Sequence, residues 1–123
     1  MLLSLLFFGC AEREGPPIHF IVPTGFTGKV DIIQDTRNGV ALPKQGGTLV
    51  CVLPATGKLQ VSSLKPFNSW HSETAAYADG TVILPRSGTN SISLFGLGGF
   101  GSGNTQGVSY FVGTEAEAAQ HRF

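Results

Sequence analysis

The sequence predicts an all-β fold, a sandwich of about seven antiparallel strands followed by a short C-terminal helix. Three observations predict it. Seventeen glycines and seven prolines among 123 residues indicate many turns and few long helices. Apolar residues make up 41% of the chain, which is enough to form a core. Short segments of alternating apolar and polar residues recur between turn sequences, a pattern typical of sandwiches and small barrels.

Seven segments have the pattern of a strand. In residues 18–22, the side chains of Ile18, Phe20 and Val22 fall on one face, which predicts a half-buried strand. Residues 49–53 are apolar throughout, so we expect a central strand covered on both faces. The expected strands are 18–22, 29–34, 49–53, 58–62, 81–84, 91–95 and 108–112, with turn sequences between them.

The last residues predict a helix instead. Thr114 and Glu117 are spaced as a capping box, in which each side chain accepts from the other residue's backbone N–H. Acidic residues stand at the start of this segment, and His121 and Arg122 stand at its end, an order that suits the helix dipole. We therefore expect one or two helical turns docked on the sheet.

Charge is sparse and balanced. Eight basic residues face eight acidic ones, and the basic residues are scattered singly along the chain. A nucleic-acid site needs clustered positive charge, so we expect no nucleic-acid partner. The two cysteines, Cys10 and Cys51, form no Cys-x-x-Cys pair, which excludes a zinc ribbon or a redox motif. Cys51 lies among apolar residues, so we interpret it as a small buried side chain and not as a reactive thiol.

The first ten residues differ from the rest of the chain. Residues 2–8 form an apolar run interrupted only by Ser4, far shorter than the roughly 20 residues that span a bilayer. Its length matches the apolar part of an export signal, an interpretation that we favour over a buried first strand or a ragged apolar end. The run is followed by Gly9 and Cys10, and together they resemble the lipobox of bacterial lipoproteins, whose cysteine becomes the lipidated N-terminal residue after cleavage.

This resemblance implies three parts: a signal and lipobox-like segment (1–10), a polar, proline-rich tether (11–17) and a β-sandwich domain (18–123). Lipidation of Cys10 would make a membrane the partner of the N-terminus and place the protein in the bacterial cell envelope. Ala11, in place of Asp, favours the outer membrane if the host is Gram-negative. Without lipidation the protein would be secreted or periplasmic, and a disulfide between Cys10 and Cys51 would become possible.

Residues 66–77 concentrate aromatic side chains and include the single tryptophan. Exposed, they would form a recognition surface, because Trp and Tyr dominate interface energetics. Buried, they would close an open end of the sandwich, which is the interpretation that we favour. The possible binding surface consists of Phe67, Trp70, His71 and Tyr77.

Other motifs are weaker. Residues 96–101 match Gly-x-Gly-x-x-Gly, but a poor helix former follows, so we reject dinucleotide binding and expect a flexible hairpin loop over 96–107. His71, Glu73 and Asp79 could hold a metal, yet their spacing is not diagnostic, and a solvated loop is favoured. Asp31 and Asp35 lack the spacing of a calcium loop. We expect no metal site and no cofactor.

Short motifs at residues 20–30 (FIVPTGFTGKV), 53–59 (LPATGKL), 77–80 (YADG) and 110–115 (YFVGTE) resemble a family of small bacterial domains of unknown function, often carried by lipoproteins or membrane-anchored chains. More loosely, residues 28–61 are similar to transthyretin-like and carboxypeptidase-regulatory modules, which implies an immunoglobulin-like or transthyretin-like sandwich. Neither resemblance implies an activity.

The sequence therefore favours a non-catalytic, exported envelope lipoprotein domain with a binding or structural role, partnered by the membrane and an envelope protein. The alternative is a module that binds a small ligand or carbohydrate through the region of Trp70. A small hydrolase-type enzyme that uses His71 is the least favoured hypothesis, because no catalytic spacing accompanies this histidine.

Overall fold

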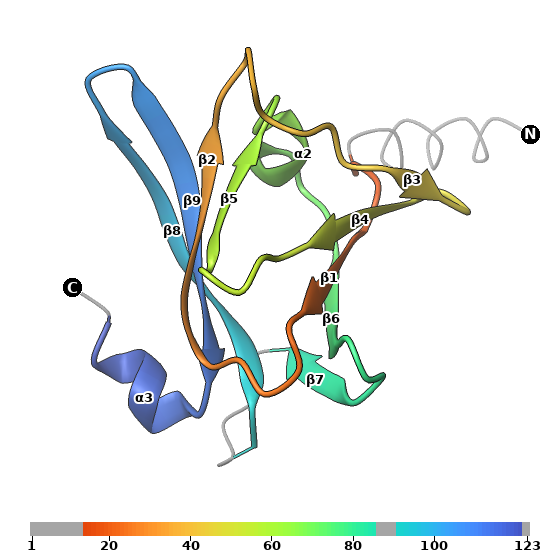
Figure 1. Cartoon of the computed structure of the whole chain (residues 1–123), viewed down its shortest axis with the longest axis vertical. Coiled ribbons are helices and arrows are strands. Elements are labelled where there is room, and N and C mark those ends of the chain that lie inside the picture. Colours follow the sequence, from red (N-terminus) through yellow and green to blue (C-terminus); the bar gives the residue numbers. More distant parts are fainter. Residues whose placement is uncertain (1–13, 86–90, 122–123) are drawn as a thin grey trace, which may run out of the picture.

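A computed structural model describes residues 14–85 and 91–121 of the chain. Within these ranges nine strands form a sheet in the order β3-β4-β1-β6-β7-β8-β9-β2-β5 (Figure 1). The strands are β1 (Ile18–Val22), β2 (Gly28–Gln34), β3 (Lys44–Gln45), β4 (Thr48–Val52), β5 (Lys58–Val61), β6 (Glu73–Tyr77), β7 (Val82–Pro85), β8 (Ser93–Ser102) and β9 (Thr105–Gly113). The two short helices are α2 (Lys65–Asn68) and α3 (Glu115–Ala119).

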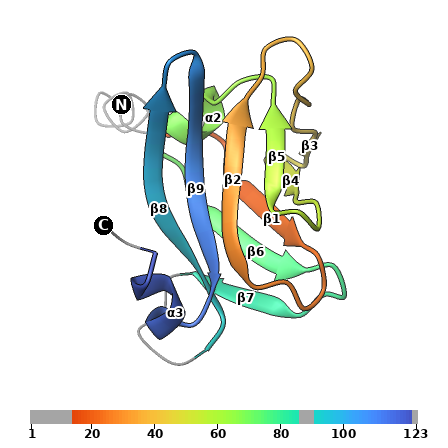
Figure 2. The same cartoon turned by 60° about the vertical axis from the view of Figure 1, so that its left-hand side comes forward.

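The sheet folds over on itself at β7. This strand pairs with β6 in one layer and with β8 in the other, so that β3, β4, β1 and β6 face β8, β9, β2 and β5 (Figure 2). The prediction of an all-β sandwich with a short C-terminal helix is confirmed.

The strand count and the strand directions need correction. The described residues contain two strands that the sequence did not predict, β3 and β6. The pairs β1·β4, β1·β6, β2·β5 and β7·β8 are parallel instead of antiparallel. Parallel neighbours need a crossover connection, and for the pairs of β1 with β4 and β6 and of β2 with β5, strands of the opposite layer supply it. The chain passes through β2 between β1 and β4, and through β5 and α2 between β4 and β6.

The core lies between the two layers. Ile18, Phe20 and Val22 of β1 are fully buried, as their alternation predicted, and they belong to the same apolar cluster as Val30 and Ile32 of β2. β4 is not the central, doubly covered strand that we expected. It lies next to the edge strand β3, and its Val52 is exposed because one face of this layer meets solvent.

Residues 96–107 form a long hairpin and not the expected flexible loop. β8 and β9 stay paired as far as Ser102 and Thr105, where Gly103 turns the chain at a positive φ of 60°. A register shift between Gly96 and Gly98 adds one residue to β8. The glycine motif therefore lies within a strand, and the helix that dinucleotide binding needs is replaced by β9.

α3 has the predicted capping box. The Thr114 hydroxyl accepts from the Glu117 backbone N–H, and the Glu117 carboxylate accepts from the Thr114 N–H. Ala118 packs with Phe95 and Phe111 on the outer side of β8 and β9, and the His121 ring stacks on Phe111 with ring centres 4.7 Å apart. Arg122 lies outside the described residues.

Part of the predicted tether is attached to the domain. The backbone N–H of Gly15 donates to the carbonyl oxygen of Trp70 (2.6 Å), and the Leu49 N–H donates to the Pro17 carbonyl (2.9 Å). The predicted signal segment 1–10, with Cys10, and tether residues 11–13 lie outside the described residues. In residues 14–85 and 91–121, no helix has the length and apolarity to cross a bilayer.

Candidate functional site

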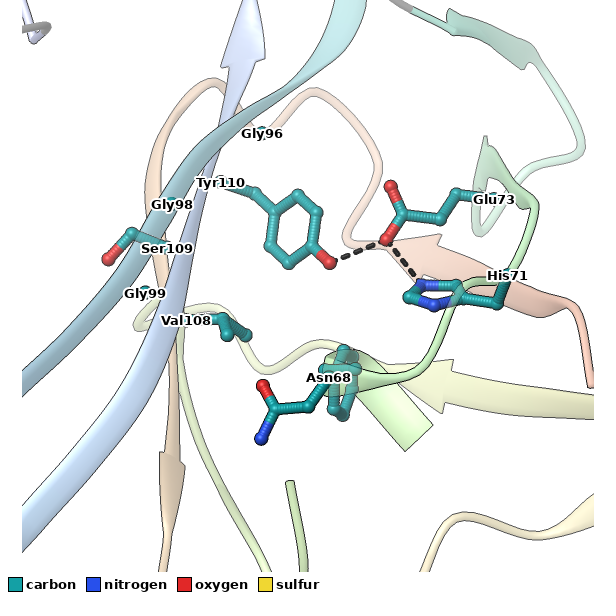
Figure 3. A pocket seen from close by; sticks show the side chains of 10 residues that line it. Asn68, His71, Glu73, Gly96, Gly98, Gly99, Val108, Ser109 and Tyr110 are labelled. Atoms are coloured by element: carbon teal, nitrogen blue, oxygen red, sulfur yellow. Dashed lines mark hydrogen bonds and ion pairs between the residues drawn. The ribbon is translucent and has the colours of Figure 1, made fainter. Parts of the chain in front are cut away.

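A cavity of about 430 Å³ lies between the beginning of β6 and the inner face of the β8–β9 hairpin (Figure 3). One wall is formed by α2 and the segment that follows it, with Phe67, Asn68, His71 and Glu73. The opposite wall is formed by β8 and β9, with Gly96, Gly98, Gly99, Val108, Ser109 and Tyr110.

The cavity exists because the two layers separate above β7 and glycines line one side. Among the described residues, β7 pairs with β8 through two residue pairs, Leu84 with Ser93 and Pro85 with Leu94. Beyond them, β8 continues with Gly96 and Gly98, where an added Cβ would meet no atom within 4 Å. The glycines of β8 thus leave unfilled space against the His71 wall, while the Leu97 side chain between them packs against the cluster of Phe95, Phe111 and Ala118.

A hydrogen-bonded group of three side chains forms the polar part of this site. The Tyr110 hydroxyl donates to Oε2 of Glu73 (2.5 Å), and Nε2 of His71 lies 2.8 Å from the same oxygen. Nδ1 of His71 lies 2.5 Å from the Ser69 carbonyl oxygen. Both ring nitrogens of His71 therefore lie within hydrogen-bond distance of an oxygen atom.

The members of this group differ in how far they are exposed to solvent. The His71 side chain is 7% exposed, whereas that of Glu73 is 29% exposed. Burial, with a contribution from the hydrogen bond to Glu73, raises the pKa of Tyr110 well above its ordinary value. Tyr110 therefore remains a hydroxyl donor, and Glu73 is the member of the group that an incoming molecule can reach.

Cys51 belongs to the core cluster that also contains Tyr110. Burial, with a smaller contribution from the negative charge of Glu73, raises the pKa of its thiol to about 12. The thiol is fully buried, as the sequence predicted.

The geometry suits binding of a polar group. Both hydrogen bonds to Glu73 reach Oε2, and within the described part of the chain no hydrogen bond to Oε1 is formed. This oxygen and the exposed Asn68 side chain can receive ligand hydroxyls or amides. The Ser109 hydroxyl donates to Asp31 (2.7 Å) and not to His71, so these residues do not form the serine–histidine pair of acyl transfer.

The predicted aromatic surface is divided by the structure. Phe67 is buried and lies edge-on to His71, with ring centres 6.5 Å apart, and both line the cavity. Trp70 is 79% exposed and does not line it. Tyr77 lies at the far end of β6, where its hydroxyl donates to the Phe26 carbonyl (2.8 Å).

Of the residues considered for metal binding, only His71 and Glu73 come together. The Asp79 carboxylate accepts from the Thr81 N–H in the β6–β7 turn. In the ranges that the structure describes, no group of three or more His, Cys, Asp and Glu side chains is suited to a metal ion. Asp35 accepts from the backbone N–H groups of Arg37 and Asn38, which makes it a turn residue.

Sequence reasoning missed Tyr110 and the glycines of β8 as parts of the site. Tyr110 alternates with Val108 and Val112, which placed it on the inner face, but Glu73 lies 37 positions away in the sequence. Gly96, Gly98 and Gly99 were recognised in the sequence, but they were interpreted as part of a flexible loop and not as the wall of a cavity.

No family model matches the sequence, and no curated protein sequence matches it. Among solved structures, the chain is similar to a protein from Bacillus anthracis described as a "putative lipoprotein". The two superpose with a TM-score of 0.50 over 82% of this chain and 70% of that chain, at 14% sequence identity. At this identity the similarity shows a shared fold.

Proposed function

We propose that this chain is a lipid-anchored domain of the bacterial cell envelope, with a binding or structural role instead of a catalytic one. The observation that carries the proposal is the apolar run 2–8 followed by Gly9 and Cys10, placed directly before a folded β domain. The solved structure that shares the fold is described as a "putative lipoprotein", which supports an uncharacterised lipoprotein-like family.

The anchor has a simple energetic basis. Each buried CH₂ of an acyl chain contributes about 0.8 kcal/mol, and a single chain holds a protein only marginally, so stable attachment needs more than one chain. Bacterial lipoproteins carry several on their cysteine. Cys10 modified in this way would hold the domain at the membrane without any transmembrane segment. In a host with an outer membrane, Ala11 after the cysteine favours that membrane.

Labelled palmitate tests the anchor. We expect the label in the wild-type chain and in the Cys51→Ala variant, and no label in Cys10→Ser. Cys51 is the matched control because its thiol is buried in the core and has a raised pKa. An unlabelled wild-type chain in an exporting bacterial host would refute the proposal.

A second candidate function is binding of a small polar ligand, such as a carbohydrate, in the cavity. It is favoured by the position of Glu73, whose Oε2 is held by His71 and Tyr110 at the wall of an open space. Charged hydrogen bonds to sugar hydroxyls are stronger than neutral ones, so the carboxylate would orient such a ligand.

Calorimetric titration with cell-wall glycan fragments tests this second function. We expect Glu73→Gln to weaken binding about tenfold, since about 1.4 kcal/mol of hydrogen bonding corresponds to that factor. Asp79→Asn, which changes a carboxylate outside the cavity, should leave affinity unchanged. Absence of binding to the wild-type chain across the fragments, or equal affinities for all three proteins, would argue against the site.

A further inference from the structure

We propose that the end of the domain that carries Trp70 rests on the lipid headgroups of the bilayer that holds Cys10, with the Trp70 ring in the membrane interface. The inference rests on the proposed anchor and adds a defined orientation to it. Three observations lead to it: where the chain leaves the domain, how Trp70 is exposed, and how charge is distributed.

The beginning of the described chain lies beside Trp70. The Gly15 N–H donates to the Trp70 carbonyl (2.6 Å), and the Ile18 N–H donates to the Ser72 carbonyl (2.9 Å). Gly15 fits closely there, since an added Cβ would lie 3.3 Å from the Cβ of Ser69. The attachment point of the domain is therefore fixed next to the tryptophan.

The remaining tether is too short to let this end move far from the membrane. Gly15 lies five positions after Cys10. Five residues span at most about 18 Å when fully extended. An acylated Cys10 would therefore keep the Trp70 backbone within roughly 20 Å of the membrane surface, less than the thickness of the bilayer itself, about 30 Å for its hydrocarbon part.

The side chain of Trp70 is largely exposed to solvent. Its exposed fraction is 79%, whereas Phe67, three positions earlier, fills the core. Removal of the apolar surface of an indole ring from water is favourable, so an exposed Trp70 gains free energy when a partner or a membrane covers it. Trp is enriched where membrane and water meet, because its ring is apolar and its N–H is polar.

Charge also distinguishes the two ends. The Trp70 end contains the exposed side chains of Lys65 in α2, Arg37 after β2 and Lys44 in β3. Two contacts place them there. Gln34 at the end of β2 accepts from the Leu64 N–H just before α2, and Lys44 pairs with Leu49, which in turn pairs with Ile18.

Acidic residues at this end are Glu14, Asp35 and Glu73, of which Asp35 is engaged by the backbone of its own turn and Glu73 by His71 and Tyr110. At the opposite end, where Figure 2 shows α3 and β7, lie Asp79, Glu115 and Glu117, together with Lys58 at the beginning of β5 and the ion pair of Lys29 with Asp31. Among the described residues, basic and acidic side chains are therefore equal in number at the Trp70 end, whereas the opposite end is net acidic, and this difference favours the Trp70 end at an anionic surface.

Fluorescence of the acylated full-length protein in phosphatidylethanolamine–phosphatidylglycerol vesicles tests the inference. Trp70 is the only tryptophan, so it reports without a label. We expect its emission to shift to shorter wavelength than in the unacylated Cys10→Ser protein. We also expect lipids brominated on their acyl chains to quench it about twofold, and aqueous iodide to quench it weakly.

The matched control carries Trp70→Phe together with Val82→Trp. Val82 is 71% exposed at the beginning of β7, and its partner Ala76 lies toward the far end of β6. This reporter should be quenched fully by iodide and not by brominated lipid. Equal iodide quenching of both reporters would overturn the orientation. Protection of Trp70 from iodide without quenching by brominated lipid would also overturn it, because the ring would then be covered by a second copy of this chain and not by lipid.

The mass of the Cys10 peptide from the same sample separates this inference from the proposed function. An unmodified Cys10 would overturn both. An acylated Cys10 combined with a Trp70 that remains in water would overturn the orientation alone.

Discussion

Glu73 is held at the wall of the cavity by two neighbours from different parts of the chain. His71 lies two positions before it, and Tyr110 reaches it from β9 in the opposite layer. Hydrogen bonds to a charged group contribute more to stability than bonds between neutral groups. The Tyr110 hydroxyl therefore both positions the carboxylate and joins the two layers.

Removal of this hydroxyl should be costly. We expect Tyr110→Phe to lower the free energy of unfolding by about 1.5–3 kcal/mol, because Glu73 loses a donor in a partly buried site. The matched control is Tyr77→Phe, whose hydroxyl donates to a neutral carbonyl, that of Phe26, and which should cost about 1 kcal/mol. Urea unfolding of both variants measures the difference, and equal losses would show that Glu73 gives Tyr110 no special role.

Cys51 should be chemically inert in the folded domain. Since burial raises the pKa of its thiol to about 12, roughly one molecule in 10⁴ carries a thiolate near pH 8. In the Cys10→Ser protein, a thiol reagent such as dithionitrobenzoate should react slowly in buffer and rapidly in guanidinium. The reaction should accelerate as the pH rises, because the thiolate fraction grows. Rapid labelling of the folded protein would contradict a buried thiol.

Single residues also show where local reasoning is limited. Phe67 and Trp70 are three positions apart in one aromatic segment, yet one fills the core and the other meets solvent. The composition of the segment identifies it as aromatic, but it does not say which aromatic ring is buried. That depends on which ring packs against the core when α2 docks on the sheet. His71 and Glu73 were recognisable as a polar pair, whereas Tyr110 became their partner only through the packing of β9.

Among the elements, the β8–β9 hairpin depends most on glycine. A Cβ added at Gly107 would lie 2.6 Å from the backbone oxygen of Ile32 and 2.4 Å from the Phe100 ring. At Gly96, by contrast, it would meet nothing within 4 Å. Neither residue has a positive φ, so space alone distinguishes the two positions.

We therefore expect Gly107→Ala to destabilise the domain by about 1–3 kcal/mol, the usual range for overpacking. Gly96→Ala should change the free energy of unfolding by less than about 0.5 kcal/mol, the usual limit for a change that meets open space. Thermal unfolding followed by circular dichroism measures both. A Gly107→Ala protein as stable as Gly96→Ala would mean that β2 and β9 are not as close as described.

The sequence predicted those strands in which large apolar side chains alternate with polar ones. β1, β2 and β5 were predicted almost to the residue, because large apolar side chains alternate in them. β6 was missed, since only Ala75 in its interior is buried and alanine gives a weak pattern. The outer half of β8 was interpreted as a loop because Gly96 and Gly98 show no alternation, although their backbone pairs with β9.

At the scale of the whole molecule, two layers connected through β7 give the domain two different ends. The end near α2 contains the attachment of the N-terminal segment and Trp70, while α3 and the β6–β7 turn form the other (Figure 1). The sandwich followed from short strands and frequent turns. Strand directions did not, because they depend on connections that cross between layers, and no local pattern encodes such crossings.

A lipid anchor at Cys10, a cavity lined by Glu73 and a membrane-facing Trp70 would together make a small envelope domain that holds its binding site close to a bilayer. The mass of the N-terminal peptide, isolated from the membrane fraction of an exporting bacterium, tests this account most directly. The account predicts a mature chain that begins at Cys10 and carries a diacylglyceryl thioether on its sulfur. A mature chain that retains residues 2–8 with an unmodified Cys10 would contradict it.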